Sequence, residues 1–108
     1  SDRSRGLIGE EELKLLGPAG HIVNTSRAEI IDQDALLRCL NDGSLGGLAT
    51  DVYTDEPADN QNELVNHPKV LATPHVGYCT EETFTIFYQE MLAAFKAFKD
   101  GQPINVIN

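Results

Sequence analysis

Apolar side chains along the chain follow two patterns, short continuous runs and one longer segment with helical spacing. The short runs predict β-strands, at residues 21–24, 48–53 and 70–73. Between residues 84 and 98 the large apolar side chains recur every three or four positions, and Gly101 follows the last of them. This spacing predicts a long helix whose apolar stripe packs in a core or against a partner.

Two shorter helices are predicted between these segments. Three glutamates begin the segment 10–16, where negative charge suits the first turn of a helix, and Gly17 ends it. Asp32 is a predicted N-cap for a second helix that ends near Gly43. The polar segment 57–68 is expected to be an exposed loop.

The alternation of helices with short apolar strands predicts an α/β fold with a parallel sheet and flanking helices. Parallel neighbours need a connection long enough to hold a helix, and such crossovers are right-handed. Three strands are few for an independent sheet, and the outer strands would present unpaired backbone groups to solvent or to a partner chain.

Composition and charge narrow the class of protein. The 108 residues and 41% hydrophobic content suit one globular domain with a core. The formal charge of -9, from 17 acidic and 8 basic side chains, opposes binding to nucleic acid or to an anionic membrane. Cys39 and Cys79 have neither metal-type nor disulfide-framework spacing, so we expect reduced thiols. Without an export or membrane-span pattern, a cytoplasmic location is the default expectation.

Three side chains with complementary chemistry each follow a predicted strand. They are Arg27, Glu56 and His75. Ligands of open α/β sheets bind beyond the carboxyl ends of the strands, so the three could meet in one crevice. A guanidinium can bind a substrate carboxylate, an imidazole can transfer a proton, and a carboxylate can orient the imidazole. Each residue alone is more often an ordinary surface or loop residue; their order along one sheet edge favours reduction of a 2-keto acid.

Three segments in fixed order carry a family resemblance. Asn-Thr-Ser-Arg at 24–27, Asp-Val-Tyr-Thr-Asp-Glu-Pro at 51–57 and Thr-Pro-His-Val-Gly at 73–77 resemble the NAD-dependent D-2-hydroxyacid dehydrogenases, which include phosphoglycerate dehydrogenases. The resemblance implies that residues 1–108 form a single partial Rossmann-like domain, the second half of a doubly wound NAD-binding domain. The family's glycine-rich loop and its separate substrate domain have no counterpart in this sequence, so the chain is expected to be a fragment.

The resemblance also implies residue roles. Arg27 matches the substrate-orienting arginine, His75 the catalytic acid/base, and Glu56 the acid paired with it. Four positions match the cofactor cleft: Asn24, Thr25, Asp51 and Gly77. Asp51 corresponds to the acid that holds the nicotinamide carboxamide.

The implied function is hydride transfer between NAD or NADP and a small D-2-hydroxy or 2-keto acid, in a homodimer without a metal. The isolated chain is expected to be inactive, because the contacts to the pyrophosphate lie outside it. An alternative is a non-catalytic half-domain that pairs through its sheet edge or its last helix. A metal hydrolase using His21, His67 and His75 is the poorest interpretation, since these residues lack the i, i+4 spacing of helical metal ligands.

Overall fold

The computed structural model describes residues 2–107, which form two compact units that divide between Val76 and Gly77. The first unit contains a parallel sheet and three α-helices, so the predicted α/β class is confirmed. The second unit contains one long helix. The expectation of one partial domain over the whole chain stays a prediction.

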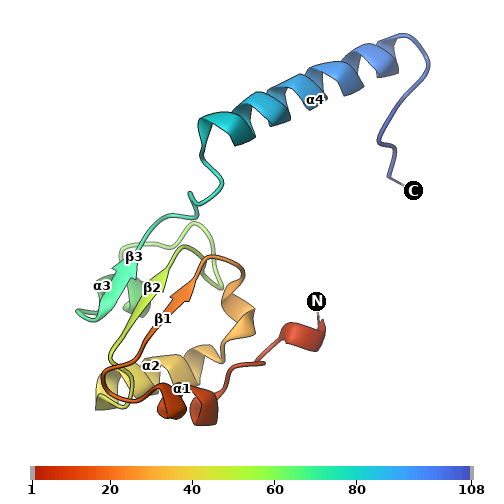
Figure 1. The fold of residues 1–108 in the computed structure, drawn as a ribbon. Helices are drawn as coiled ribbons and strands as arrows, with labels where there is room; N and C mark the ends of the chain where they lie inside the picture. The colour runs from red at the N-terminus through yellow and green to blue at the C-terminus, as the bar shows by residue number, and fades with distance from the viewer. Residues whose placement is uncertain (1, 108) are drawn as a thin grey trace. The chain divides into compact units, whose positions relative to one another are not determined.

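The sheet has three parallel strands in the order β1-β2-β3 (Figure 1). Their bounds are β1 His21–Asn24, β2 Gly47–Thr50 and β3 Val70–Ala72. The first strand has the predicted bounds, whereas the other two end earlier than predicted. The hydroxyl of Thr50 donates to the Val52 carbonyl at 2.9 Å and accepts from the Val52 N–H at 3.3 Å. This local turn, typical of threonine, ends β2 before Asp51.

The α-helices of the first unit are α1 Glu10–Leu16, α2 Gln33–Asp42 and α3 Glu63–Asn66, and short 3-10 turns span Asp2–Ser4 and Ala28–Ile30. The predicted ends of α2 are confirmed. The Asp32 carboxylate accepts from the Ala35 N–H at 3.0 Å, and Gly43 closes the helix with a φ of 81°. That left-handed backbone is open to glycine without steric cost.

The expectation of an exposed loop over residues 57–68 was wrong in its second half, where α3 lies. The side chain of Asn62 caps this helix, accepting from the Leu64 N–H at 3.0 Å. Leu64 is only 9% exposed and belongs to the core cluster. One buried leucine and one capping asparagine thus order a segment whose other side chains are mostly polar.

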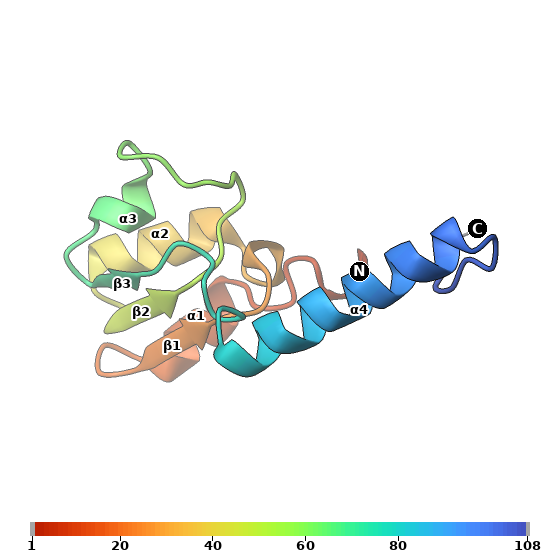
Figure 2. The ribbon, with the colours of Figure 1, turned by 90° about the horizontal axis from the view of Figure 1, so that it is seen from above.

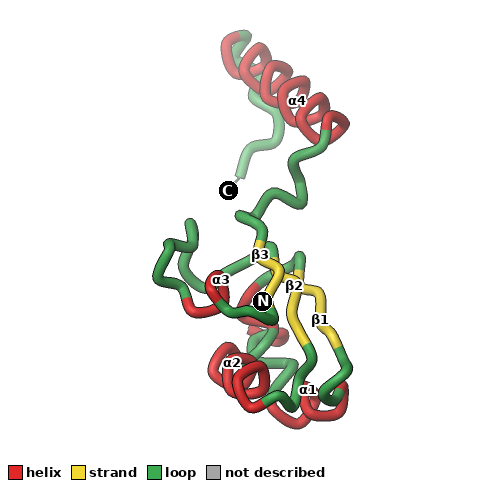
Figure 3. The backbone as a smooth tube through the Cα atoms, turned by 90° about the vertical axis from the view of Figure 1, so that its left-hand side faces the viewer, coloured by secondary structure: helices red, strands yellow, loops and turns green. Residues whose placement is uncertain are grey.

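The two faces of the sheet differ in what covers them. Helices α1, α2 and α3 lie on one face (Figures 2 and 3). Leu48 of β2 belongs to the core cluster on that face, and its register partners Ile22 and Val70 pack against the cluster. The next register row points to the other face: Val23, Ala49 and Leu71. Val23 is 71% exposed and Leu71 is 69% exposed, so the described first unit leaves this face open.

Helix α4 of the second unit spans Glu81–Lys99, as the apolar spacing predicts. Thr80 caps it by accepting from the Thr83 N–H at 3.2 Å. All of its large apolar side chains are exposed, by 42–72%: Phe84, Ile86, Phe87, Tyr88, Met91, Leu92, Phe95 and Phe98. Within residues 2–107, no helix is long and apolar enough to cross a membrane. Both cysteines are free thiols, Cys39 buried and Cys79 exposed.

Candidate active site

The three predicted catalytic residues lie around one cavity at the carboxyl end of the sheet. Arg27 follows β1, Glu56 follows β2 and His75 follows β3. All three line a cavity of about 280 Å³, together with backbone and side-chain atoms of the loops after β1 and β2. The topology therefore brings together residues that are far apart in the sequence, from Arg27 to His75.

A short polar contact in this cavity joins the histidine to the acid. Nδ1 of His75 lies 2.6 Å from Oε2 of Glu56, and the two side chains are 35% and 34% exposed. The second carboxylate oxygen, Oε1, accepts from the backbone N–H of Tyr53 at 2.9 Å. With both oxygens bonded, the carboxyl group has a fixed orientation toward the imidazole.

The electrostatics of the cavity keep the acid ionised. The hydrogen bond with His75 lowers the pKa of Glu56 below its usual value, and the Tyr53 N–H adds to this effect. The nearby charge of Arg27 lowers the same pKa further, although by less. An ionised Glu56 is an acceptor only, so at neutral pH a proton in the shared hydrogen bond belongs to the imidazole Nδ1.

Arg27 is presented by a turn that Asn24 holds. Arg27 is exposed, with extended backbone (φ -146°, ψ 139°) at the start of the 3-10 turn Ala28–Ile30. The amide of Asn24 donates to the Arg27 carbonyl at 2.9 Å and accepts from the Ser26 N–H at 3.1 Å. Asn24 is 8% exposed, and both of these side-chain bonds are made to the turn. Their effect is to fix where the guanidinium leaves the backbone.

Of the four predicted cofactor residues, Asn24 holds the turn of Arg27, and two of the other three line a cavity. Thr25 and Asp51 line a smaller cavity of about 60 Å³ at the same edge of the sheet. Asp51 is 4% exposed, and its Oδ1 accepts from the Thr73 hydroxyl at 2.6 Å and from the Val76 N–H at 2.9 Å. Gly77 belongs to the other compact unit. A carboxylate accepts hydrogen bonds, and a hydroxyl can both donate and accept them, so this edge of the sheet is lined by groups that can bind a polar ligand.

Two residues at the site were not predicted from the sequence. Tyr53 and Thr73 connect the loops that carry Glu56 and His75, through the Tyr53 hydroxyl, which donates to the Thr73 carbonyl at 3.0 Å. Both are hydroxyl residues within the motifs at 51–57 and 73–77, two or three residues from predicted site positions, and this is the signal that could have found them. Within residues 2–107, no group of three or more His, Cys, Asp or Glu side chains could hold a metal ion.

The three parallel strands, with their loops gathered at the carboxyl edge, have the arrangement of part of a Rossmann-type α/β domain. Residues 1–77 match the family model for the NAD-binding domain of the D-isomer specific 2-hydroxyacid dehydrogenases. The chain belongs to this family.

Curated relatives and solved structures agree with this assignment. The chain is 34% identical over 106 residues to a glycerate dehydrogenase of Methylorubrum extorquens, covering 96% of the chain and 34% of the relative. It is 36% identical over 103 residues to a glyoxylate reductase of Thermococcus litoralis, covering 94% and 31%. The chain thus spans about a third of the length of these relatives.

Two solved structures share the fold. A D-lactate dehydrogenase of Treponema pallidum superposes with a TM-score of 0.82 at 30% identity, covering 97% of this chain and 36% of that one. An NADPH-dependent glyoxylate/hydroxypyruvate reductase of Sinorhizobium meliloti gives a TM-score of 0.77 at 27% identity, covering 94% and 33%.

Proposed function

We propose that this chain supplies the catalytic residues of an NAD- or NADP-dependent oxidoreductase that interconverts a small D-2-hydroxy acid and its 2-keto acid. The observation that carries the proposal is the 2.6 Å contact between His75 and Glu56 in a cavity that Arg27 also lines. An imidazole oriented by a carboxylate, beside a guanidinium, is the set of groups that this reaction requires.

Arg27 binds and orients the substrate. Its guanidinium can donate two parallel N–H bonds to the substrate carboxylate, which fixes the neighbouring carbonyl carbon in the cavity. The Asn24 amide supports this role by holding the turn from which Arg27 projects, through its 2.9 Å bond to the Arg27 carbonyl.

His75 transfers the proton that balances the hydride. In the reducing direction the imidazolium donates a proton from Nε2 to the substrate carbonyl oxygen, and in the oxidising direction the neutral ring accepts it from the hydroxyl. Glu56 stays ionised beside Nδ1, so it accepts the Nδ1 proton and fixes the ring orientation.

The nicotinamide cofactor supplies or accepts the hydride when it is bound. Asp51 and Thr25 line the cavity at the edge of the sheet where the amide of the ring would bind. The assignment of Asn24 and Gly77 to cofactor binding rests on their positions in the sequence motifs. The cofactor is NAD or NADP, since the family is NAD-binding and one structural relative is NADPH-dependent.

A chimera tests this function within a full-length enzyme. The 108 residues replace the matching third of the Thermococcus litoralis glyoxylate reductase, and reduction of glyoxylate is followed by the loss of NADH or NADPH absorbance. We expect His75→Gln to lower kcat at least about a hundredfold, because general acid–base catalysis contributes that much. His21→Gln is the matched control, since His21 is an exposed residue at the opposite end of β1. An active chimera that tolerates His75→Gln would contradict the assignment.

The isolated chain itself is expected to be inactive and to show no saturable binding of NADH. Its 108 residues contain no glycine-rich loop to receive the pyrophosphate of a dinucleotide. A fluorescence titration with NADH, followed by a glyoxylate reduction assay on the same sample, measures both properties. Saturable binding or turnover by the isolated chain would overturn this part of the proposal.

A second candidate function is homodimerisation through helix α4. The supporting observation is that Phe95 and Phe98 are 65% and 72% exposed, on a helix whose large apolar side chains are all uncovered within the described residues. Apolar surface of this kind recruits a partner in solution. Light scattering after size-exclusion chromatography is expected to give twice the chain mass of 11.8 kDa, and Phe95→Glu is expected to give the monomer. A wild-type chain that elutes as a monomer would contradict this function.

A further inference from the structure

His75 has a backbone conformation that histidine seldom adopts. Its φ of 55° lies in the left-handed region, which residues with a Cβ avoid unless their surroundings impose it. The preceding residue, Pro74, has no backbone N–H with which to anchor the chain. Other groups must therefore hold the segment around His75 in place.

One oxygen of a buried carboxylate holds the chain on both sides of His75. Oδ1 of Asp51 accepts from the Thr73 hydroxyl at 2.6 Å and from the Val76 N–H at 2.9 Å. Asp51 is 4% exposed, so both bonds to its carboxylate form where water competes little. The histidine therefore lies between two points that are fixed to the end of β2.

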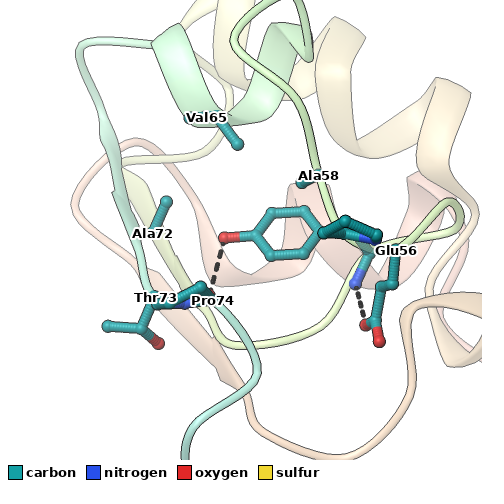
Figure 4. Close-up of a pocket in the computed structure, with 8 residues that line it drawn as sticks. Glu56, Ala58, Val65, Ala72, Thr73 and Pro74 are labelled. Atoms are coloured by element: carbon teal, nitrogen blue, oxygen red, sulfur yellow. Dashed lines mark hydrogen bonds between the residues drawn. The ribbon is translucent and has the colours of Figure 1, made fainter.

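Tyr53 connects the same segment to the acid. Its hydroxyl donates to the Thr73 carbonyl at 3.0 Å and its backbone N–H donates to Glu56 Oε1 at 2.9 Å, the two bonds drawn as dashed lines in Figure 4. Burial raises the pKa of Tyr53, and the nearby carboxylates Asp51 and Glu56 raise it further, so the hydroxyl remains a donor at neutral pH. The side chain is 6% exposed and forms part of the wall of a cavity of about 150 Å³ that Glu56 and Thr73 also line.

We propose that the hydroxyls of Thr73 and Tyr53 form a clamp that holds His75 in its left-handed conformation and in contact with Glu56. Both hydroxyls are used in protein contacts, to Asp51 and to the Thr73 carbonyl, so both residues act through His75. They are positioning residues. The inference rests on the proposed function only for the acid/base role of His75; the clamp itself is a statement about structure.

Nuclear magnetic resonance of the isotope-labelled 108-residue chain tests the clamp without turnover. Two signals report on it. The cross peak between the amide proton and the Hα of His75 is strong when φ is positive, because the two protons then lie close together. The Nδ1 proton of the His75 ring is observed when the hydrogen bond to Glu56 shelters it from exchange with water.

Thr73→Val and Tyr53→Phe each remove one hydroxyl and keep nearly the same shape. We expect each variant to lose the Nδ1 proton signal and to weaken the His75 cross peak, while the amide signal of the buried Leu36 shows that the chain is still folded. Thr73→Ser keeps the hydroxyl and is expected to retain both signals. Tyr88→Phe is the matched control, because Tyr88 is 66% exposed on α4.

Loss of either signal in either folded variant supports the clamp. Retention of both signals in both folded variants overturns it, as does a Thr73→Ser chain that loses them. If Thr73→Val fails to fold, Tyr53→Phe, which removes one oxygen atom, decides the question. In the chimera, Thr73→Val is expected to lower kcat at least about tenfold with little change in KM, and Thr73→Ser is expected to restore it. Activity that survives His75→Gln would remove the proposed function and leave the magnetic resonance result standing.

Discussion

The two faces of the sheet provide a matched test of how the first unit is stabilised. Leu48 on β2 and Leu71 on β3 are both strand leucines, but they point to opposite faces. Leu48 is 4% exposed in the core beneath the helices, whereas Leu71 is 69% exposed on the open face. Truncating each to alanine removes the same atoms from two different environments.

The expected costs differ by at least about 1 kcal/mol. Leu→Ala in a packed core costs about 2–5 kcal/mol, because the cavity left behind adds to the lost transfer free energy. Complete burial of a leucine side chain is worth roughly 1.5–3 kcal/mol, so a leucine that is two-thirds exposed should lose less than about 1 kcal/mol. We therefore expect Leu48→Ala to cost at least about 2 kcal/mol and Leu71→Ala less than about 1 kcal/mol.

Urea unfolding followed by circular dichroism measures both free energies of unfolding. Domains are stable by roughly 5–15 kcal/mol, so near the lower limit an unfolded Leu48→Ala chain also meets the expectation. Equal costs for the two variants would refute the assignment of an open face, because Leu71 would then be as buried in solution as Leu48. Repeating the Leu71→Ala measurement over a tenfold range of protein concentration would then show whether a second copy covers that face.

Three further outcomes follow from single contacts. Thr73→Val should lower the free energy of unfolding by roughly 1.5–3 kcal/mol, the value of a hydrogen bond to a charged group, and a urea midpoint equal to wild type would contradict the 2.6 Å contact with Asp51. His75→Ala should raise the pKa of Glu56, which carbon NMR of its carboxyl group measures. Because that pKa is lowered in the folded wild-type chain, wild type should lose the associated stability as the pH falls below 4.5. The variant should lose less stability over the same pH range. Asp32→Ala should cost about 0.5–2 kcal/mol by removing the N-cap of α2, in urea unfolding; a cost near zero would mean that the bond to the Ala35 N–H contributes nothing.

Local chemistry made much of the fold predictable from the sequence. The cap of α2 at Asp32 and its stop at Gly43 involve residues near in sequence, and both are confirmed. The end of β2 was misjudged because the Thr50 hydroxyl makes a turn where the apolar run continues. Helix α3 was missed because Leu64 alone fixes it to the core, and one apolar residue leaves no periodicity to detect.

The sequence predicted the main residues of the candidate site but not the contacts that hold them. The order of motifs indicated Arg27, Glu56 and His75, and the structure brings these three residues around one cavity. Their roles in catalysis stay predictions. The contacts of Thr73 and Tyr53 were not predictable, since they join side chains to groups 20 and 22 residues away and depend on how the strand-end loops meet.

The backbone of His75 shows why the site depends on those distant contacts. Among residues 2–107, only His75 and Asn105 have a positive φ without being glycine. A left-handed backbone at a residue with a Cβ costs free energy, so local propensity opposes the conformation that brings the imidazole to Glu56. The buried Asp51 offsets that cost by bonding the chain on both sides of His75. The acid assigned to the cofactor cleft is therefore also the group that keeps the histidine in place, and substitutions of Asp51 should disturb the His75–Glu56 contact even when no cofactor is bound.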